Sequence, residues 1–314
     1  MSNEIAFFPG CSLEGTAVEY RQSLEAIAPK LGLSLKEVED WNCCGATAAH
    51  NLNHKLSLAL PARILAQAEA AGHRQIVAPC AACSHRLLST RHELAQDPAL
   101  SKEISDVIEM PYRGTVQVKN ILQLLQDVGF DKIAAACTKK MTGIKIAAYY
   151  GCLLVRPAKV MQFDEVENPQ SMEKLLAALG AKPVEWGLKT ECCGGGFSIS
   201  RTDAVCKLVK DLLDNAAAEG AVVFAVACPM CQSNLDLRQH NVNQRYGTKY
   251  KIPVLYITQW IGLCMGMSPR ELGLHQNFVD TAEAIAEAFK PAPAPVKKPV
   301  PKPVEEAVGS GSKQ

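Results

Sequence analysis

The chain of 314 residues has an ordinary globular composition, with 48% hydrophobic residues, 21% charged residues and a formal net charge of +1. At about 150 residues per domain, this length predicts roughly two domains, each able to bury a core of its own. The near-zero charge leaves no basic field for nucleic acid. The sequence has no apolar stretch of the roughly 18 residues that a membrane helix needs, and its N-terminal residues do not resemble a secretory signal. We therefore expect a cytoplasmic protein without direct membrane insertion.

The first half of the chain is predicted to alternate strands and helices, with a cysteine after each strand. Strands are predicted at 5–8, 34–38 and 75–78, and helices at 17–31 and 56–71, the second closed by Gly72. Cys11 follows the first strand, Cys43-Cys44-Gly45 the second, and Cys80-Ala81-Ala82-Cys83 the third.

The second half repeats this order. Strands are predicted at 145–150, 183–186 and 222–227, before Cys152, before Cys192-Cys193-Gly194 and before Cys228-Pro229-Met230-Cys231. After the last cysteine of each half, 114–122 and 253–260 each predict a short strand or turn that caps a helix. From residue 290 a Pro/Ala/Lys-rich tail cannot bury a core and should be extended or disordered.

The cysteines form one pattern that is written twice. The spacing is C-x31-CC-x35-C-x2-C in the first copy and C-x39-CC-x34-C-x2-C in the second, which accounts for ten of the thirteen cysteines. A repeated constellation is far more specific than a lone Cys-x-x-Cys. Strands that alternate with helices predict an α/β fold with parallel-type sheets, and ligands of such sheets collect at the carboxyl ends of the strands. Every motif cysteine falls there.

Three kinds of site are compatible with five thiols in each half. Zinc or a cubane cluster would use four of them and leave one over. A thioredoxin-type dithiol at Cys80 and Cys83 would leave the other three unexplained. An extended multi-iron cluster fits best, because adjacent cysteines point in different directions. Gly45, Gly194 and Gly195 would let the backbone approach such a cofactor and donate amide hydrogen bonds to its sulfurs, although a simple strand-to-helix turn also uses glycine there.

The residues resemble the cysteine-rich CCG-domain family, and most closely the B-type subunit of heterodisulfide reductase. The resemblance spans roughly residues 4–266 and rests on the segments Phe8-Pro9-Gly10-Cys11, Trp41-Asn42-Cys43-Cys44-Gly45, Tyr150-Gly151-Cys152, Cys192-Cys193-Gly194-Gly195-Gly196 and Cys228-Pro229-Met230-Cys231. It implies two tandem pseudo-symmetric Rossmann-like CCG domains, at 1–140 and 141–275. Residues 276–314 would then form a helix-like segment and the tail.

The resemblance also implies two noncubane [4Fe-4S] clusters, with the cysteines acting in catalysis through them. Cluster 1 would be held by Cys11, Cys43, Cys44, Cys80 and Cys83, and cluster 2 by Cys152, Cys192, Cys193, Cys228 and Cys231. The implied activity is reduction of a small disulfide to two thiols, or the reverse. The chain has no flavin or nicotinamide motif, so electrons would come from a ferredoxin-like [4Fe-4S] subunit of the C type and a flavin-containing subunit of the A type.

The sequence leaves two other functions open. The chain could be an electron-transfer subunit that never touches a disulfide, or a zinc-stabilised scaffold. Outside the repeat we expect Cys137, Cys206 and Cys264 to be buried or incidental. His50, His54 and His85 could relay protons and Arg63, Arg86 and Arg156 could attract an anion, although structural roles are expected for the histidines.

Overall fold

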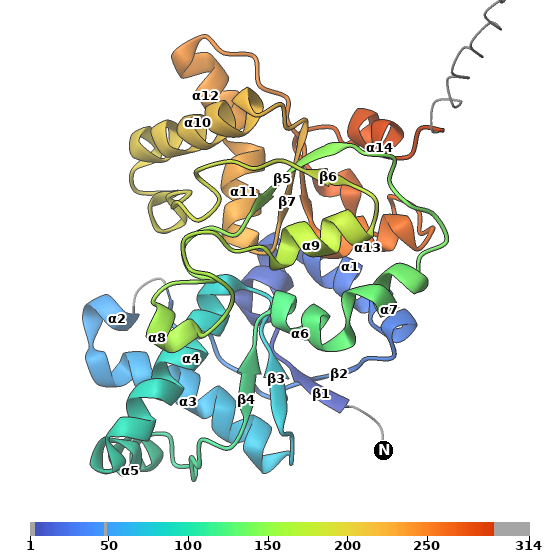
Figure 1. The fold of residues 1–314 in the computed structure, drawn as a ribbon. Coiled ribbons are helices and arrows are strands. Elements are labelled where there is room, and N and C mark those ends of the chain that lie inside the picture. Colours follow the sequence, from blue (N-terminus) through green and yellow to red (C-terminus); the bar gives the residue numbers. More distant parts are fainter. Residues whose placement is uncertain (1–3, 47–48, 292–314) are drawn as a thin grey trace, which may run out of the picture.

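Two four-stranded parallel sheets form the centre of the protein, one in each half of the chain (Figure 1). The computed structural model describes residues 4–46 and 49–291. The strand orders are β2-β1-β3-β4 and β6-β5-β7-β8, so the two sheets have the same topology. The predicted fold class is confirmed. The strands are β1 (Glu4–Phe7), β2 (Ser34–Glu37), β3 (Gln75–Val77), β4 (Gln117–Lys119), β5 (Lys145–Tyr149), β6 (Lys182–Pro183), β7 (Val223–Val226) and β8 (Val254–Tyr256).

Strand β6 departs most from its predicted range, 183–186, whereas the other predicted strand ranges differ by one residue at one or both ends. It contains only Lys182 and Pro183 and pairs with Lys145 and Ile146. The Val184 amide still donates to the Ile146 carbonyl. The next carbonyl, that of Ala148, instead accepts a hydrogen bond of 3.0 Å from the Trp186 indole. Because a side chain occupies that acceptor, the backbone ladder stops.

Helix α1 also ends earlier than predicted. The expected helix at 17–31 consists of α1 (Val18–Ile27) and a short 3-10 turn (Pro29–Leu31), and a π-helical turn (Ser12–Thr16) precedes it. Pro29 lacks the amide that would continue the α-helical ladder, which accounts for the break. The expected helix at 56–71 is α3 (His54–Ala70), capped by the Asn53 side chain.

The segments after the last cysteines fold as predicted in both halves. In the first, β4 leads into α6 (Ile121–Val128) through a capping box made by Asn120 and Gln123. In the second, β8 leads into α13 (Ile257–Cys264). The other helices are α2 (Ala49–Leu52), α4 (Ala81–Gln96), α5 (Pro98–Val107), α7 (Phe130–Ala135), α8 (Ala158–Met161), α9 (Ser171–Ala178), α10 (Thr202–Ala218), α11 (Pro229–Leu237), α12 (Gln239–Tyr246) and α14 (Ala282–Ala288), with 3-10 turns at Gly195–Phe197 and Leu274–Gln276.

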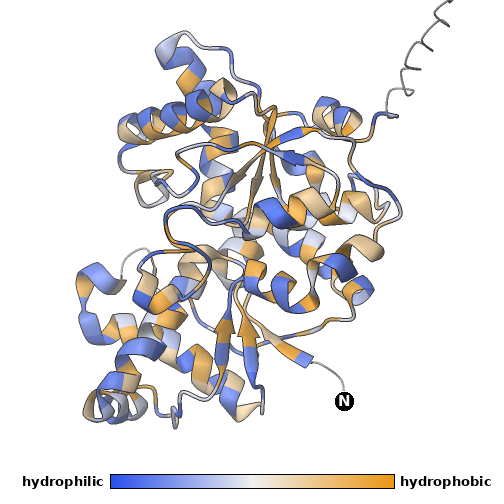
Figure 2. Cartoon of the chain, viewed as in Figure 1, coloured by the Kyte–Doolittle hydropathy of each residue, from blue (hydrophilic) through white to orange (hydrophobic). Residues whose placement is uncertain are grey.

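One continuous hydrophobic core connects the two halves. Figure 2 shows apolar strands at the centre of both sheets and hydrophilic residues on the outer faces of the helices. Between the halves, the buried rings of Tyr20 and Tyr256 stack with their centroids 4.0 Å apart. The Tyr20 hydroxyl donates to the Ala227 carbonyl at 3.2 Å, and the buried hydroxyls of Ser23 and Thr258 lie 2.7 Å apart. Helix α1 of the first half is thus bound to α13 of the second.

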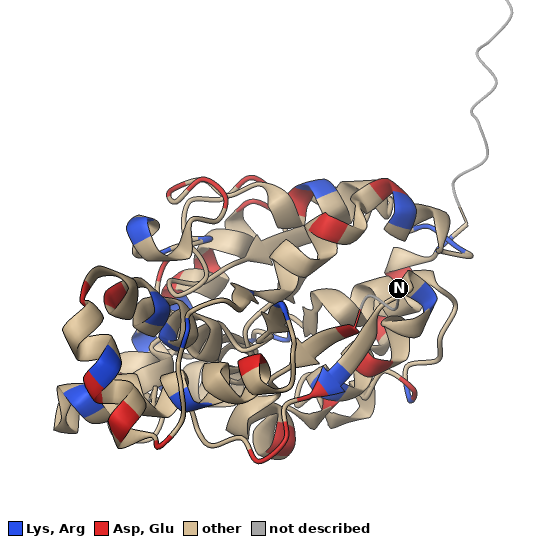
Figure 3. Cartoon of the chain, turned by 90° about the horizontal axis from the view of Figure 1, so that it is seen from below, with Lys and Arg blue, Asp and Glu red and all other residues tan. Residues whose placement is uncertain are grey.

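The surface carries both signs of charge, interspersed rather than gathered on one face in the view of Figure 3. No helix within the described ranges is long and apolar enough to cross a membrane. The tail predicted to be extended or disordered lies, from residue 292 onward, outside the described residues.

The contact between the two hydroxyls leads to a prediction about stability. Thr258→Val and Ser23→Ala should each lower the free energy of unfolding by about 1 kcal/mol, because each removes a buried hydrogen-bonding partner. Their double-mutant coupling, measured by denaturant unfolding, should be about 1 kcal/mol. Ser84→Ala is the matched control, since Ser84 is equally buried and donates to a carbonyl three residues back, as Ser23 does. Full additivity of Ser23→Ala with Thr258→Val would contradict the contact.

Candidate metal-cluster sites

The motif cysteines all lie beyond the carboxyl ends of the strands, as predicted. Cys11 follows β1, Cys43 and Cys44 follow β2, and Cys80 is the N-cap residue of α4 directly after β3. In the second half, Cys228 is likewise the N-cap residue of α11 after β7. Parallel strands bring their carboxyl ends to one edge of the sheet, so three distant loops meet at each site.

Sulfur contacts are the same in the two halves. The Sγ atoms of Cys44 and Cys83 are 3.4 Å apart, and those of Cys193 and Cys231 are 3.6 Å apart. The Gly45 amide donates to Cys43 Sγ at 3.4 Å. Its counterpart is the bond of 3.3 Å from the Gly194 amide to Cys192 Sγ. The glycine amides therefore point at sulfur, as expected for residues around a sulfur-rich cofactor.

Exposure divides the two sets in the same way except at their first cysteine. Cys43 and Cys192, the first residues of the two Cys-Cys pairs, are exposed, whereas the second residues, Cys44 and Cys193, are buried. Both members of each Cys-x-x-Cys are buried, Cys11 is exposed and Cys152 is half-buried. Each site therefore has a buried floor of thiols and an open side.

Hydrogen bonds between thiols shift their pKa values in opposite directions. Bonds from Cys43 and Cys83 lower the pKa of Cys44 to about 3, whereas the bond to Cys44 raises the pKa of Cys43. In the second half, a bond from Cys152 lowers the pKa of Cys192 to about 6 and raises that of Cys152 itself. Thiolate is the form of cysteine that binds metal, and these hydrogen bonds favour that form at Cys44 and Cys192.

A cavity of about 60 Å³ marks the second site. All five cysteines of the second set line it, and so does Ala81, which lies between Cys80 and Cys83 in the first half. Within the described ranges, no three His, Cys, Asp or Glu side chains are gathered closely enough to hold one metal ion. The thiols of the second set therefore surround a space rather than one point, and the first half contributes to its wall.

Gly10 and Gly151 leave room for the buried sulfurs. Both have positive φ, +62° and +65°. A β-carbon at Gly10 would lie 2.9 Å from Cys83 Sγ, and one at Gly151 would lie 2.8 Å from Cys231 Sγ. Any side chain at either position would push a sulfur of the buried floor. The importance of these two glycines did not emerge from the sequence alone, because their contact partner is about 70 to 80 residues away.

The two sites differ at one equivalent position. Arg86 follows Cys80 by six residues, and Asn234 follows Cys228 by six. Arg86 donates to the Ser57 carbonyl at 2.7 Å, and its charge contributes to the lowered pKa of Cys44. Asn234 instead donates to the Cys193 carbonyl at 2.9 Å and lies 3.7 Å from Cys193 Sγ. The first site thus has a cation where the second has a neutral amide.

A buried ion pair supports the second site, and sequence reasoning missed it. Lys189 Nζ lies 2.7 Å from a carboxylate oxygen of Glu173, and both side chains are at most 5% exposed. The Tyr150 hydroxyl also donates to Glu173. The Lys189 carbonyl accepts from the amides of Tyr150 and Gly151, which joins the loop of Cys152 to the loop of Cys192. A lone Lys in a loop gives no sequence signal of burial.

The secondary candidates take mostly structural positions. Arg63 pairs with Asp40, Arg156 with Glu167 at 2.8 Å, and His54 with Glu93 at 2.8 Å. Burial and the neighbouring Arg86 lower the pKa of His85.

Of the cysteines outside the repeat, Cys206 and Cys264 are buried and Cys137 is half-buried. A hydrogen bond between Cys137 and Cys264 lowers the pKa of the first thiol and raises that of the second. The Thr138 and Lys139 amides both donate to the Cys264 carbonyl at 3.0 Å. Cys137 and Cys264 therefore belong to a second contact between the two halves of the chain.

Fold and sequence together define an α/β protein of two tandem cysteine-rich domains, with equivalent sets of five cysteines at equivalent sheet edges. The family model described as "CCG: Cysteine-rich domain" matches residues 5–87 and 146–236. The chain belongs to this family.

Its relatives include subunits of two kinds of reductase. One is the 8-methylmenaquinol:fumarate reductase membrane anchor subunit of Wolinella succinogenes, 34% identical over 90% of this chain and 99% of the relative. Others are the B-type subunits of heterodisulfide reductases from Methanosarcina acetivorans, 31% identical over 91% of this chain and 97% of the relative, and from Methanosarcina mazei, 30% identical over 92% and 98%. The suspected similarity to the B-type subunit is confirmed.

A solved structure shares the fold. It is a hypothetical protein from Helicobacter pylori, with a TM-score of 0.69 and 11% identity, matching 89% of this chain. The matched part is 52% of that longer protein, so the likeness bears on the fold alone.

The tight glycine contacts predict a loss specific to the sites. Gly10→Ala and Gly151→Ala should lower the iron bound per chain, because the new methyl group displaces Cys83 or Cys231. Gly32→Ala is the matched control, since Gly32 has φ of +72° but nothing within 4 Å of its β-carbon position. All three variants share the backbone strain of about 1 kcal/mol. Equal iron content in Gly10→Ala and Gly32→Ala, measured after anaerobic purification, would show that the contact is unimportant.

Proposed function

We propose that this protein is the catalytic subunit of a heterodisulfide reductase-like complex. It reduces a disulfide to two thiols, or oxidises two thiols in the reverse direction, and each turnover of R–S–S–R′ consumes two electrons and two protons. Two noncubane [4Fe-4S] clusters, held by the ten motif cysteines, supply the one-electron chemistry when bound. The ligands proposed for the first are Cys11, Cys43, Cys44, Cys80 and Cys83, and for the second Cys152, Cys192, Cys193, Cys228 and Cys231.

The observation that carries this proposal is the equivalence of the two sites together with their closeness. Both sites have the same sulfur contacts and the same amide-to-sulfur hydrogen bonds. Ala81 of the first half lines the cavity of the second set. Burial raises the pKa of Tyr20, and the nearby Cys228 and Cys80, one from each set, raise it further. A disulfide has two sulfurs, and two adjacent one-electron sites match that requirement.

The residues of this chain fit an iron-sulfur cofactor. Amides of Gly45 and Gly194 donate to sulfur, which stabilises negative charge on thiolates and tunes the potential of such cofactors. The exposed Cys43 and Cys192 leave one side of each site open to a small substrate, while the buried thiols exclude water from the floor.

Electrons are proposed to arrive from partner subunits. The relatives named as heterodisulfide reductases are each one lettered subunit of their enzyme, so they act with other chains. By resemblance, the partners are a ferredoxin-like [4Fe-4S] subunit and a flavin-containing subunit. Beside the second site, Phe197 and Ile199 are 56% and 96% exposed, which suits a contact with such a donor. The cytoplasmic location stays a prediction.

A second candidate is an electron-transfer subunit without substrate chemistry. The observation in its favour is the relative from Wolinella succinogenes, which is named as part of a fumarate reductase and not of a disulfide reductase. In that case both sites would pass electrons, and no disulfide or thiol would enter either of them.

Loss of one cysteine motif should distinguish disulfide reduction from electron transfer without substrate chemistry. Anaerobically purified wild type should contain about eight irons per chain by the four-iron count of each cluster, and its EPR signal should change when a thiol or disulfide is added. Cys44→Ser or Cys193→Ser should abolish disulfide reduction and leave about half of the iron. Cys206→Ser, at a buried cysteine outside the repeat, is the control and should keep both. Near-normal turnover with one complete motif lost would refute the two-site mechanism, iron without any EPR response would favour electron transfer, and zinc alone would point to a scaffold.

The arginine at the first site predicts unequal reduction potentials. Reduction adds negative charge to the first-site cluster. The half-buried Arg86 guanidinium stabilises that charge, because water screens it less than at the surface. Arg86→Gln should therefore lower the potential of the first-site cluster and leave the second unchanged, as followed by EPR during a redox titration. The Cys→Ser variants assign the two signals. Arg74→Gln is the control, because Arg74 is exposed and directly precedes β3, at the opposite end of that strand from the cysteine loops. An unchanged first potential would exclude this role for Arg86.

A further inference from the structure

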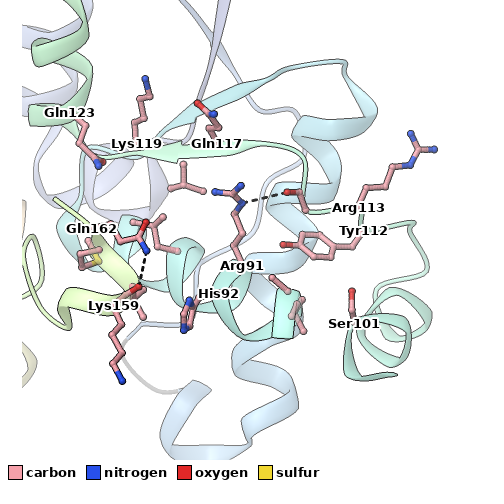
Figure 4. A pocket seen from close by; sticks show the side chains of 17 residues that line it. Arg91, His92, Ser101, Tyr112, Arg113, Gln117, Lys119, Gln123, Lys159 and Gln162 are labelled. Atoms are coloured by element: carbon pink, nitrogen blue, oxygen red, sulfur yellow. Dashed lines mark hydrogen bonds between the residues drawn. The ribbon is translucent and has the colours of Figure 1, made fainter. Parts of the chain in front are cut away.

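A second and larger cavity, of about 520 Å³, lies away from the cysteine sites (Figure 4). Its walls are the C-terminal part of α4, the segment that leads into β4, and α8 of the second half. None of the ten motif cysteines lines it. Both halves of the chain contribute to it, because residues 88–123 belong to the first and residues 159–162 to the second.

The lining of this cavity is basic. It includes Arg91, Arg113, Lys119 and Lys159 but no Asp or Glu. Lys119 is neutralised by an ion pair with Asp127. Arg91 is different: its side chain stands in the middle of the view in Figure 4, and its Nε donates only to the Gly114 carbonyl at 3.4 Å. Among the described residues, no carboxylate forms an ion pair with Arg91, although it is half-buried.

A tyrosine hydroxyl is also left unsatisfied there. The Tyr112 hydroxyl is shielded from solvent and has no hydrogen-bond partner in the described part of the chain. Its ring points toward Arg91 in Figure 4. Burial raises the pKa of Tyr112 to about 12, so the hydroxyl is a donor at neutral pH. Glu69, whose charge also acts on Tyr112, is occupied by hydrogen bonds from the Arg113 and Thr115 amides.

The opposite wall offers a polar side chain held in an unusual conformation. Gln162 follows α8 with φ of +42°, a left-handed backbone that is uncommon outside glycine. Its amide nitrogen lies 3.3 Å from the Lys159 carbonyl, and Figure 4 shows it facing the same space as Arg91. Donors from both halves therefore converge on one cavity.

We propose that this cavity binds a small organic anion, whose carboxylate or phosphate group is held by Arg91 and Tyr112. A guanidinium forms paired hydrogen bonds with such groups, and a half-buried one without a counter-ion gains most from them. The volume lies within the range of small-molecule sites, about 300 to 1,000 Å³. Lys159 and Arg113 also line the cavity and add positive charge near it. Binding would tie α8 of the second half to α4 of the first.

The test measures binding to the full-length, anaerobically purified protein by calorimetry at constant ionic strength. The probes are AMP for a phosphate and glutarate for a carboxylate, and adenosine and glutaramide are their uncharged counterparts. At least one anion should bind saturably, and its uncharged counterpart should not. Arg91→Gln should weaken binding about tenfold or more and Tyr112→Phe about fivefold, as expected for a charged and a neutral hydrogen bond. Whichever anion binds identifies the head group.

Lys249→Gln is the control variant, because Lys249 is exposed and does not line this cavity. Its affinity should equal that of wild type within about twofold, the usual effect of a distant surface charge. Circular dichroism and iron content check that each variant is folded and loaded. If neither AMP nor glutarate binds, or if Arg91→Gln binds as well as Lys249→Gln, the proposal is wrong. The readout is binding alone, so it does not depend on the disulfide chemistry.

Discussion

The parallel pairing of strands is the constraint on which both cysteine sites depend. It fixes the carboxyl ends of β1, β2 and β3 at one edge of the first sheet, and those of β5, β6 and β7 at one edge of the second. Loops separated by more than 30 residues thereby bring thiols to within 3.4 Å and 3.6 Å of each other. At β6 the backbone pairing is short. There the Trp186 indole donates a hydrogen bond to the Ala148 carbonyl and keeps its loop against the sheet.

Helix α1 connects the first cysteine loop to the contact between the two halves. Helix α1 begins soon after Cys11, and its Tyr20 and Ser23 contact α13 and the end of β7. The contact between the halves and the first cysteine loop are therefore consecutive parts of the chain. A change in how the halves pack would also shift the second site, because Tyr20 donates to the carbonyl of Ala227, which directly precedes Cys228. The stability of the contact between the halves and the geometry of the first cysteine loop are therefore linked, because consecutive residues of the chain form both.

Duplication has not made the halves identical. Arg86 and Asn234 occupy equivalent places yet differ in charge, and the buried pair of Lys189 and Glu173 supports the second site. A buried ion pair contributes little net stability, but loss of either partner would leave an unpaired charge under the Cys152 loop. In the proposed reaction, such differences would suit a disulfide whose two ends are not the same. The cavity next to α8, proposed to bind an anion, adds a feature to which both halves contribute.

The sequence by itself determined the α/β class, the position of ten cysteines after the strands and most strand ranges, while their role as cluster ligands stays a prediction. It could do so because the duplicated spacing and the strand-cysteine order are local properties. Three features depended on contacts between distant segments and so were decided only by the tertiary structure. These are the closeness of Ala81 to the second set, the space that Gly10 and Gly151 leave for Cys83 and Cys231, and the cavity around Arg91. No pattern along the chain encodes a distance between residues 70 or more positions apart, because only packing sets it.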